Sequence, residues 1–496
     1  MRIIFSSISS FVLFVVCCFS IQYTYAYDLI LTPNCQKAYS NIMAMRVSEG
    51  REQLINELRA NKKNLMPVIL INYEDFVSLT FNENTKRYNE RKGLLKKRLD
   101  ALEYADKNSP YYLFGKGLLY LQWSIIKAKH DDLLDAAWDF RKSYLLFSEN
   151  KKKFPNFQYH NLYLGVQKAL ISTIPKGYRW ISNILGLKGN MQEGIALIQN
   201  ACKNNDYAFK EEAYLYSIYL KNFLENEPEA ALNLIQTYNL DTKNNLLYTF
   251  LAANLSLNNK NADKAIYYLK NRNTSKDYMP FPMLDYEMGD AKLKLLDYTC
   301  QQDFSLFLKK YSGHFYIKEC LHQMSLCAYL QGNVSLANQY RKEILIKGKT
   351  TSDADKQAQQ FANETDYPDI KLLKAKLLND GGKNKEALDI LKTSNEKSFS
   401  KHEEQVEYCY RIARIYDALE NTDKAIEFYS KTISLGKNDK DYFAARAALQ
   451  IGAIYEQKKQ LDSAIRYYTL AMNCKNTSFK NSIDQRALSA INRIKK

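Results

Sequence analysis

The sequence predicts an all-α protein, a solenoid of stacked helix–turn–helix repeats with a less regular helical N-terminal half. Two observations support this prediction. Only 9 Pro and 17 Gly occur in 496 residues, and β-rich or loop-rich folds need more of these turn-forming residues. In addition, small and aromatic residues recur near the C-terminus at a constant interval, as stacked helix pairs require.

Residues 1–26 have the layout of a secretory signal peptide. Arg2 is their only charged residue, an apolar run covers residues 3–21, and Thr24 and Ala26 supply small side chains before the expected cleavage point. We expect cleavage after Ala26 and export to the periplasm or cell envelope. An uncleaved inner-membrane anchor and a lipoprotein signal are the alternatives.

Residues 27–206 are predicted to form a helical domain with degenerate repeats. Ser109 and Pro110 are typical of a helix start, with Ser as the cap and Pro in the first turn, and this helix carries Trp123. The segment 165–198 is unusually apolar and is interrupted by glycines. It is either a buried helical hairpin or an exposed binding or membrane-contacting surface.

Residues 207–346 are predicted to contain further helix pairs with a weaker pattern. Ala231 and Ala265 each stand at the start of a predicted second helix that follows an apolar first helix. The polar segment 347–364 is the candidate junction to the clearer repeats of residues 365–496.

The clearest repeats lie in this last segment. Ala425 and Ala464, which open predicted second helices, are 39 residues apart, and so are Tyr416 and Tyr455 in the predicted first helices. A small residue lets two helices cross closely and the aromatic residue covers the crossing, so each helix has one apolar face. Because one helix pair cannot bury its own face, the copies must stack.

These residues resemble the tetratricopeptide repeat. The matching positions are Ala413, Tyr416, Ala425 and Tyr429 in one copy, and Gly452, Tyr455, Ala464, Tyr468 and Ala471 in the next. The interval of 39 residues exceeds the family period of about 34, which implies longer turns or longer second helices.

Most of the chain after the leader also resembles exported tetratricopeptide-repeat proteins of Bacteroidota. The resemblance rests on the Ser-Pro-Tyr-Tyr-Leu-Phe segment at 109–114, the helix pair with Trp123, and the Ile-Pro, Trp and Leu-Gly positions from Ile174 to Gly186. It implies a repeat fold and a Gram-negative setting, and it carries no established activity.

The family resemblance implies that first helices line a concave surface that binds a peptide or a partner helix. The residues carried over to this surface are Asp369, Lys376, Asn379, Glu407, Tyr410, Arg414, Asp417, Arg446, Leu449, Glu456 and Gln457. They do not reproduce the Lys, Asn and Arg set with which some family members grip a terminal carboxylate. The alternative is that these side chains only solvate the surface.

The formal net charge is +16, with Lys and Arg spread along the chain among Asp and Glu. Such interleaving is typical of solvated helix faces. An acidic protein partner or an anionic membrane surface is the alternative, and we do not expect a nucleic-acid partner.

The seven cysteines after the leader are scattered, odd in number and without a C-x-x-C pair. This pattern predicts neither a disulfide scaffold nor a zinc site. We expect Cys409 and Cys327 to be small buried residues at helix contacts, and one disulfide among the others stays open.

No catalytic motif is present, and the five histidines are not paired at metal-ligand spacing. We therefore expect neither enzyme activity nor a cofactor or metal. The favoured function is an exported scaffold or adaptor that mediates protein–protein interactions in the cell envelope. The alternatives are a periplasmic glycan-binding or small-molecule-binding protein and a lipid-associated envelope protein.

Overall fold

The computed structural model describes residues 26–174, 186–204, 206–225, 227–475 and 478–495. Within these ranges the regular structure is helical, and β-pairing is limited to two isolated bridges, Tyr27 with Ala105 and Asp28 with Asn64. The prediction of an all-α repeat fold is confirmed. The predicted signal peptide, except Ala26, lies outside the described residues.

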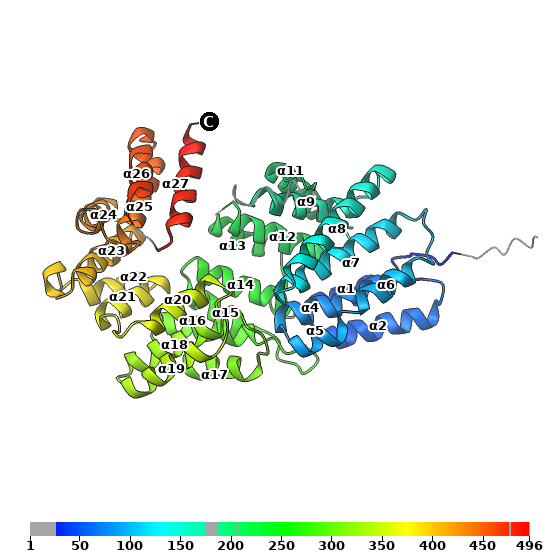
Figure 1. Ribbon diagram of the computed structural model, residues 1–496, viewed down its shortest axis with the longest axis horizontal. Helices are drawn as coiled ribbons and strands as arrows, with labels where there is room; N and C mark the ends of the chain where they lie inside the picture. Colours follow the sequence, from blue (N-terminus) through cyan, green and yellow to red (C-terminus); the bar gives the residue numbers. More distant parts are fainter. Residues whose placement is uncertain (1–25, 175–185, 205, 226, 476–477, 496) are drawn as a thin grey trace, which may run out of the picture. The chain divides into compact units, whose positions relative to one another are not determined.

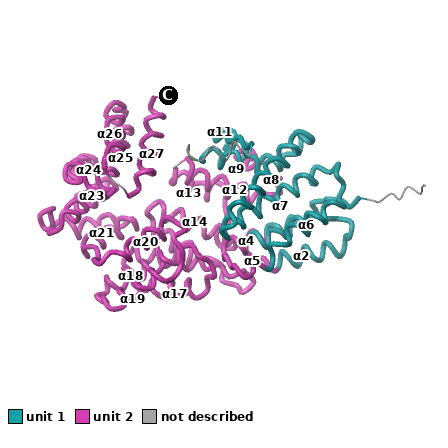
Figure 2. The backbone as a smooth tube through the Cα atoms, in the orientation of Figure 1, with its two compact units in different colours: residues 1–40, 49–76, 90–197 teal, residues 41–48, 77–89, 198–496 magenta. Residues whose placement is uncertain are grey.

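The chain forms two compact units, which are coloured separately in Figure 2. Unit 1 comprises residues 1–40, 49–76 and 90–197, and unit 2 comprises residues 41–48, 77–89 and 198–496. The two units thus share the N-terminal part of the chain in alternating segments. The domain boundaries inferred from the sequence stay predictions.

The helices of the N-terminal part, seen in blue to green in Figure 1, precede the regular repeats. They are α1 (Pro33–Met43), α2 (Val47–Ala60), α3 (Met66–Leu70), α4 (Asn72–Asn82), α5 (Thr85–Arg91), α6 (Leu94–Leu102), α7 (Pro110–Lys129), α8 (Leu133–Lys153), α9 (Tyr159–Ser172) and α11 (Met191–Lys203).

Helix α7 begins as the sequence predicts. The Ser109 hydroxyl accepts a hydrogen bond from the Tyr111 backbone N–H, and Pro110 occupies the first turn, which needs no donor from that residue. Helices α7 and α8 pack against each other. Trp123 from α7 and Phe147 from α8 are fully buried, so this pair supplies much of the core of unit 1.

Part of the described 165–198 segment is buried, although Leu170 and residues 188–190 are exposed. Helix α9 buries most of its residues. Ile171 at its end and Leu187 after it form a small apolar cluster with Phe140 and Tyr144 of α8. This favours the buried alternative for α9 and Leu187, and the choice for the rest of the segment stays a prediction. Residues 175–185, including Pro175 and Trp180, lie outside the described residues.

The helices of unit 2 follow one another in pairs. They are α12 (Lys210–Phe223) with α13 (Pro228–Thr237), α14 (Leu246–Asn258) with α15 (Ala262–Asn271), α16 (Met283–Lys294) with α17 (Cys300–Lys310), α18 (Ile317–Leu330) with α19 (Val334–Ile346), then α20 (Asp353–Asn363), α21 (Ile370–Asp380) with α22 (Asn384–Leu391), the short 3-10 helix η2 (Glu396–Ser398), α23 (His402–Ala418) with α24 (Thr422–Gly436), α25 (Phe443–Gln457) with α26 (Leu461–Asn473), and α27 (Lys480–Ile494).

The candidate junction at 347–364 contains helix α20, which packs on α18 and α19. Its buried Asp355 accepts hydrogen bonds from the backbone N–H groups of Tyr316 and Lys318, so it satisfies donors at the start of α18. Nearby, Arg341 lies against the rings of Phe361 and Tyr367. This polar segment is therefore fixed to the preceding repeat.

The small and aromatic positions of the C-terminal repeats pack as predicted. Ala425 and Ala464 are completely buried, and Tyr429 and Tyr468 are almost completely buried beside them. The hydrophobic clusters run continuously from α23 to α27. Stacking of copies, which the pattern required, is thus what buries the apolar faces.

Two turns of unit 2 that are distant in sequence touch each other. The Ala262 N–H, at the start of α15, donates to the Gly381 carbonyl at 3.1 Å. Gly382 adopts φ +88°, and a Cβ there would lie 2.2 Å from the Lys260 carbonyl oxygen. Only glycine fits this contact, which we call the turn clasp.

Candidate functional site

The predicted binding surface belongs to the first helices of the last repeats. Helices α21, α23 and α25 are these first helices, and each contacts the next one in the row. Apart from Asp369, every predicted side chain lies on one of these three helices. We call these side chains the first-helix face.

Two predicted residues hold helix ends. Asp369 caps α21, and its carboxylate accepts hydrogen bonds from the N–H groups of Lys371 and Leu372 at 2.8 and 3.0 Å. The buried Asn379 donates its amide to Asn384 at 2.8 Å across the turn to α22. These hydrogen bonds satisfy polar groups at the start of α21 and in the turn to α22. Both side chains therefore stabilise their own repeat and already have hydrogen-bond partners within it.

An ion pair joins two neighbouring first helices. Arg414 on α23 donates to Asp380 on α21 at 2.8 Å, and both side chains are partly buried. Burial alone would raise the pKa of Asp380, but Arg414, Lys376 and Arg411 lower it to about 2. Asp380 is therefore ionised at physiological pH, and the pair is maintained.

A lysine from a distant repeat completes this group of charges. Lys260 follows α14, and burial together with the charge of Arg414 lowers its pKa to about 8, while Asp380 and Asp417 act in the opposite direction. Burial raises the pKa of Asp417. In the part of the chain that the structure describes, neither Lys260 nor Lys376 forms an ion pair. The charged cluster consists of Lys260, Lys376, Asp380, Glu407, Arg411, Arg414 and Asp417.

Helix α23 turns one of its predicted residues inward. Tyr410 is buried, and its ring packs on Tyr429 and Phe443. Arg411 is also buried and donates two hydrogen bonds to Glu407, at 2.7 and 2.9 Å. The ring of Tyr410 is thus part of the core, and the charges around it form the edge of the first-helix face.

Helix α25 presents a cation that rests on two rings. The Arg446 guanidinium lies 5.0 Å from the centroid of Tyr442 and 4.8 Å from that of Phe479, distances typical of cation–π contacts. No carboxylate pairs with Arg446 among the described residues. Leu449 is half-buried against the core, whereas Gln457 is exposed. Gln457 is therefore accessible to a partner, and Arg446 is half-buried with no carboxylate partner in the described ranges.

Asp417 and Glu456 hold equivalent positions in successive repeats. The Tyr429 hydroxyl donates to Asp417 at 3.1 Å, and the Tyr468 hydroxyl donates to Glu456 at 2.6 Å. Glu456 also accepts two hydrogen bonds from Arg493 of α27, both at 2.9 Å. These acids fasten the second helix to the first, and each leaves only part of its carboxylate for other contacts.

Sequence reasoning missed three residues of this region, namely Arg411, Lys260 and Arg493. Arg411 had a signal, because it lies four residues after Glu407 on the same helix, a spacing that favours an ion pair. Lys260 and Arg493 come from other repeats. Only the stacking of the repeats brings them to Asp380 and Glu456, so no local pattern marks them.

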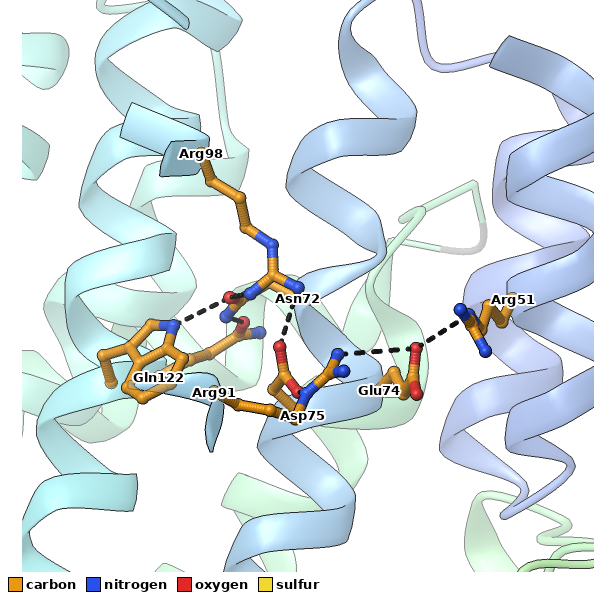
Figure 3. A network of polar contacts seen from close by, with 8 residues as sticks. Arg51, Asn72, Glu74, Asp75, Arg91, Arg98 and Gln122 are labelled. Carbon is orange, nitrogen blue, oxygen red and sulfur yellow. Dashed lines mark hydrogen bonds and ion pairs between the residues drawn. The ribbon is translucent and has the colours of Figure 1, made fainter. Parts of the chain in front are cut away.

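Unit 1 contains a separate buried polar network, shown in Figure 3. The fully buried Asp75 on α4 pairs with Arg91 of α5 and, at 2.7 Å, with Arg98 of α6. Glu74 pairs with Arg91 at 3.8 Å and with Arg51 of α2 at 3.3 Å. The two acidic residues of α4 thus form ion pairs with arginines from three other helices, α2, α5 and α6.

The other end of this network lies on α7. The side-chain oxygen Oδ1 of Asn72 accepts hydrogen bonds from Arg98 and from the Trp123 indole N–H, the latter at 2.8 Å. The Asn72 amide donates to the Gln122 side chain at 2.6 Å. Charges buried in this way are tolerated when they compensate one another, so we interpret the network as a structural link within unit 1.

The described ranges offer no clear centre for chemistry. Within them, no group of His, Cys, Asp and Glu side chains is arranged to hold a metal ion. No helix in the same ranges has the length and apolar character needed to cross a membrane. His160 is fully buried, and burial together with the charge of Lys151 lowers its pKa to about 4.

A family model described as tetratricopeptide repeat matches residues 406–439 and 445–474. The matches coincide with the α23–α24 and α25–α26 pairs, so the C-terminal part contains tetratricopeptide repeats, as predicted. Repeats of this kind in general mediate protein–protein interactions. No curated protein matches the chain.

Several solved structures are similar in part. The Naa15/Naa10 complex bound to HypK-THB is 14% identical over 93% of this chain and 66% of its own, with a TM-score of 0.26. The TPR domain of P58(IPK) is 14% identical over 85% of this chain and 97% of its own, with a TM-score of 0.21. Yeast Tom70 is 12% identical over 93% of this chain and 89% of its own, with a TM-score of 0.24. Scores this low do not extend the fold assignment or transfer a function.

Proposed function

We propose that this protein is an exported scaffold or adaptor that holds protein partners on its first-helix face. The proposal is supported by two basic side chains on first helices that have no carboxylate partner in the described part of the chain. These residues, Lys376 and Arg446, lie on the first helices α21 and α25, which are two repeats apart. A rigid surface with ready-made polar contacts loses little conformational entropy on binding.

The partner class that fits is a peptide or a partner helix. The face combines the charged cluster with Arg446 on its two rings, and arginine and aromatic residues are enriched where proteins bind one another. The repeats supply the geometry, since stacked first helices form an extended surface. Glycan or small-molecule binding and lipid association remain the alternatives, and neither has a specific observation in its favour.

The exported location rests on the sequence of residues 1–26 alone. The proposal predicts that the secreted chain begins at Tyr27, because Ala26 is the expected cleavage point. N-terminal sequencing of the protein purified from an envelope or periplasmic fraction tests this. Recovery from the cytoplasm with Met1 or Arg2 at its N-terminus would contradict the exported location without affecting the binding role.

The binding role is tested by co-purification from cross-linked envelope fractions. We expect Lys376→Glu combined with Arg446→Glu to reduce recovery of specific protein partners about tenfold or more. The matched control is Lys385→Glu combined with Arg466→Glu, which reverses two exposed charges on second helices and should leave recovery unchanged. Equal recovery with both double variants, at equal melting temperatures, would refute a partner site on the first-helix face.

A further inference from the structure

Three buried cysteines gather where α17 packs on α18. Cys300 begins α17, while Cys320 and Cys327 lie on α18, two helical turns apart and therefore on one side of that helix. All three are completely buried, and their thiols are free in the structure. The contact between these two helices thus holds a concentration of thiols.

Only two of the three thiols face each other. The Sγ atoms of Cys300 and Cys327 are 3.3 Å apart, and a disulfide bond has a length of about 2.05 Å. Closing the remaining gap needs a shift of about 1.2 Å, shared between two side chains. The Cys320 thiol instead lies 3.7 Å from the Phe304 carbonyl oxygen. Cys320 is as buried as the other two cysteines but has no sulfur partner, so it serves as a control.

We propose that Cys300 and Cys327 form an intramolecular disulfide bond by exchange with a small-molecule or protein disulfide. The Cys327 thiolate attacks one sulfur of the oxidant and releases its first thiol. The deprotonated Cys300 then attacks the Cys327 sulfur and releases the second thiol. Two protein thiols are oxidised to one disulfide, and the oxidant is reduced to two thiols, which take up the two protons.

The surroundings of the pair assign the order of attack. The Cys300 thiol donates a hydrogen bond to Cys327, which lowers the pKa of Cys327 and raises the pKa of Cys300. The Gln331 amide lies 3.4 Å from the Cys327 sulfur and also favours its thiolate. Cys327 is therefore the first nucleophile, because the thiolate is the reactive form.

Burial decides when the bond can form. Neither sulfur is accessible in the folded chain, so the oxidant must act during folding or when α17 opens locally. The bond would close a loop of residues 27 apart in sequence that contains all of α17. This inference does not depend on the proposed binding role, and disulfides of this kind persist in oxidising compartments.

The test is disulfide mapping of the full chain refolded with oxidised or with reduced glutathione. Free thiols are blocked with N-ethylmaleimide under denaturing conditions, and the digested peptides are analysed by mass spectrometry. In the oxidised sample we expect the peptides of Cys300 and Cys327 to be joined and neither of these two cysteines to carry maleimide. We also expect its melting temperature to be several degrees above that of the reduced sample.

Variants separate this pair from its neighbour. Cys320→Ser should keep the joined peptides, whereas Cys300→Ser should lose them and should also lose the difference in melting temperature. The wild-type peptide map decides the question even where a variant fails to fold. Maleimide on both Cys300 and Cys327 in the oxidised sample, or a bond that involves Cys320 instead, would overturn the proposal.

Discussion

The Tyr468 hydroxyl donates a hydrogen bond to the Glu456 carboxylate at 2.6 Å, and Tyr429 repeats this contact with Asp417 in the preceding repeat. In both cases the second helix contributes the phenol and the first helix contributes the acid. The ring fills the space beside a small residue while its hydroxyl finds a charged acceptor. The tyrosine therefore contributes both to the packing of its repeat, through its ring, and to the polar contact between the two helices, through its hydroxyl.

The hydrogen bond between Tyr468 and Glu456 should be measurable as a coupling energy between the two residues. Tyr468→Phe removes the hydroxyl and keeps the ring, so we expect a loss of about 1 to 2 kcal/mol in the free energy of unfolding. A double-mutant cycle with Glu456→Gln, read from urea unfolding, should show a coupling of about 1 kcal/mol. The same cycle between Tyr468 and the exposed Asp462 should give none. Strict additivity of the Tyr468 and Glu456 changes would show that the hydrogen bond contributes nothing.

Glu287 should make unit 2 less stable as the pH rises. Burial, aided by Asp290, raises its pKa to about 7, against the opposing effects of Asn254 and Lys294. Because the folded-state pKa lies above the unfolded value, this contribution to stability is complete below about pH 4.5 and is lost as the pH rises through 7.

The matching substitution is Glu287→Gln, which keeps an acceptor for the Asn254 amide. We expect it to stabilise the protein at pH 8 by up to about 3 kcal/mol and to have little effect near pH 4.5. Melting temperatures of both proteins across this range provide the measurement, with Glu386→Gln as the exposed control. A constant difference between wild type and Glu287→Gln at all pH values would contradict the assignment.

His160 should have the opposite dependence in unit 1. Its pKa is lowered to about 4 by burial and by Lys151, so the unfolded chain binds a proton that the folded chain does not. This contribution to stability is complete above about pH 6.5 and is lost as the pH falls to about 4, by up to about 3 kcal/mol. His160→Gln should flatten that part of the pH profile, whereas His402→Gln, at an exposed site, should not.

The buried network of Figure 3 should be sensitive to the loss of Asp75. Asp75→Ala leaves Arg91 and Arg98 without their shared carboxylate, and we expect a loss of about 3 to 5 kcal/mol. The control is Asp100→Ala, which breaks an exposed pair with Lys96 and should cost less than about 1 kcal/mol. Similar losses for both variants in chemical unfolding would argue against a structural role of the network.

The packing of the C-terminal repeats could be predicted because its determinants are local. Gly452 illustrates this, since a Cβ there would lie 2.7 Å from the ring of Tyr468, and both residues belong to one copy of the pattern. The start of α7 at Ser109 was also predictable, because a cap and a first-turn proline act on adjacent residues. Recurring small and aromatic positions therefore carry most of the information about the fold.

The first-helix face was less predictable, because the next repeat decides which side chains stay accessible. Tyr410 occupies a position expected to face a partner, yet Phe443 of the following repeat covers its ring. Arg414 was expected to face a partner and is paired with Asp380 of the preceding repeat. Such contacts depend on how far each repeat rotates against its neighbour, and the interval between copies does not encode that angle.

The turn clasp changes how unit 2 should respond to force. Where each repeat contacts only the adjacent repeats, the row can lengthen gradually as neighbouring repeats move apart. Here the hydrogen bond from Ala262 to Gly381 fastens α14–α15 to α21–α22 with α16–α20 between them. We therefore expect this stretch to resist extension more than the repeats from α23 onward, which lie outside the clasp.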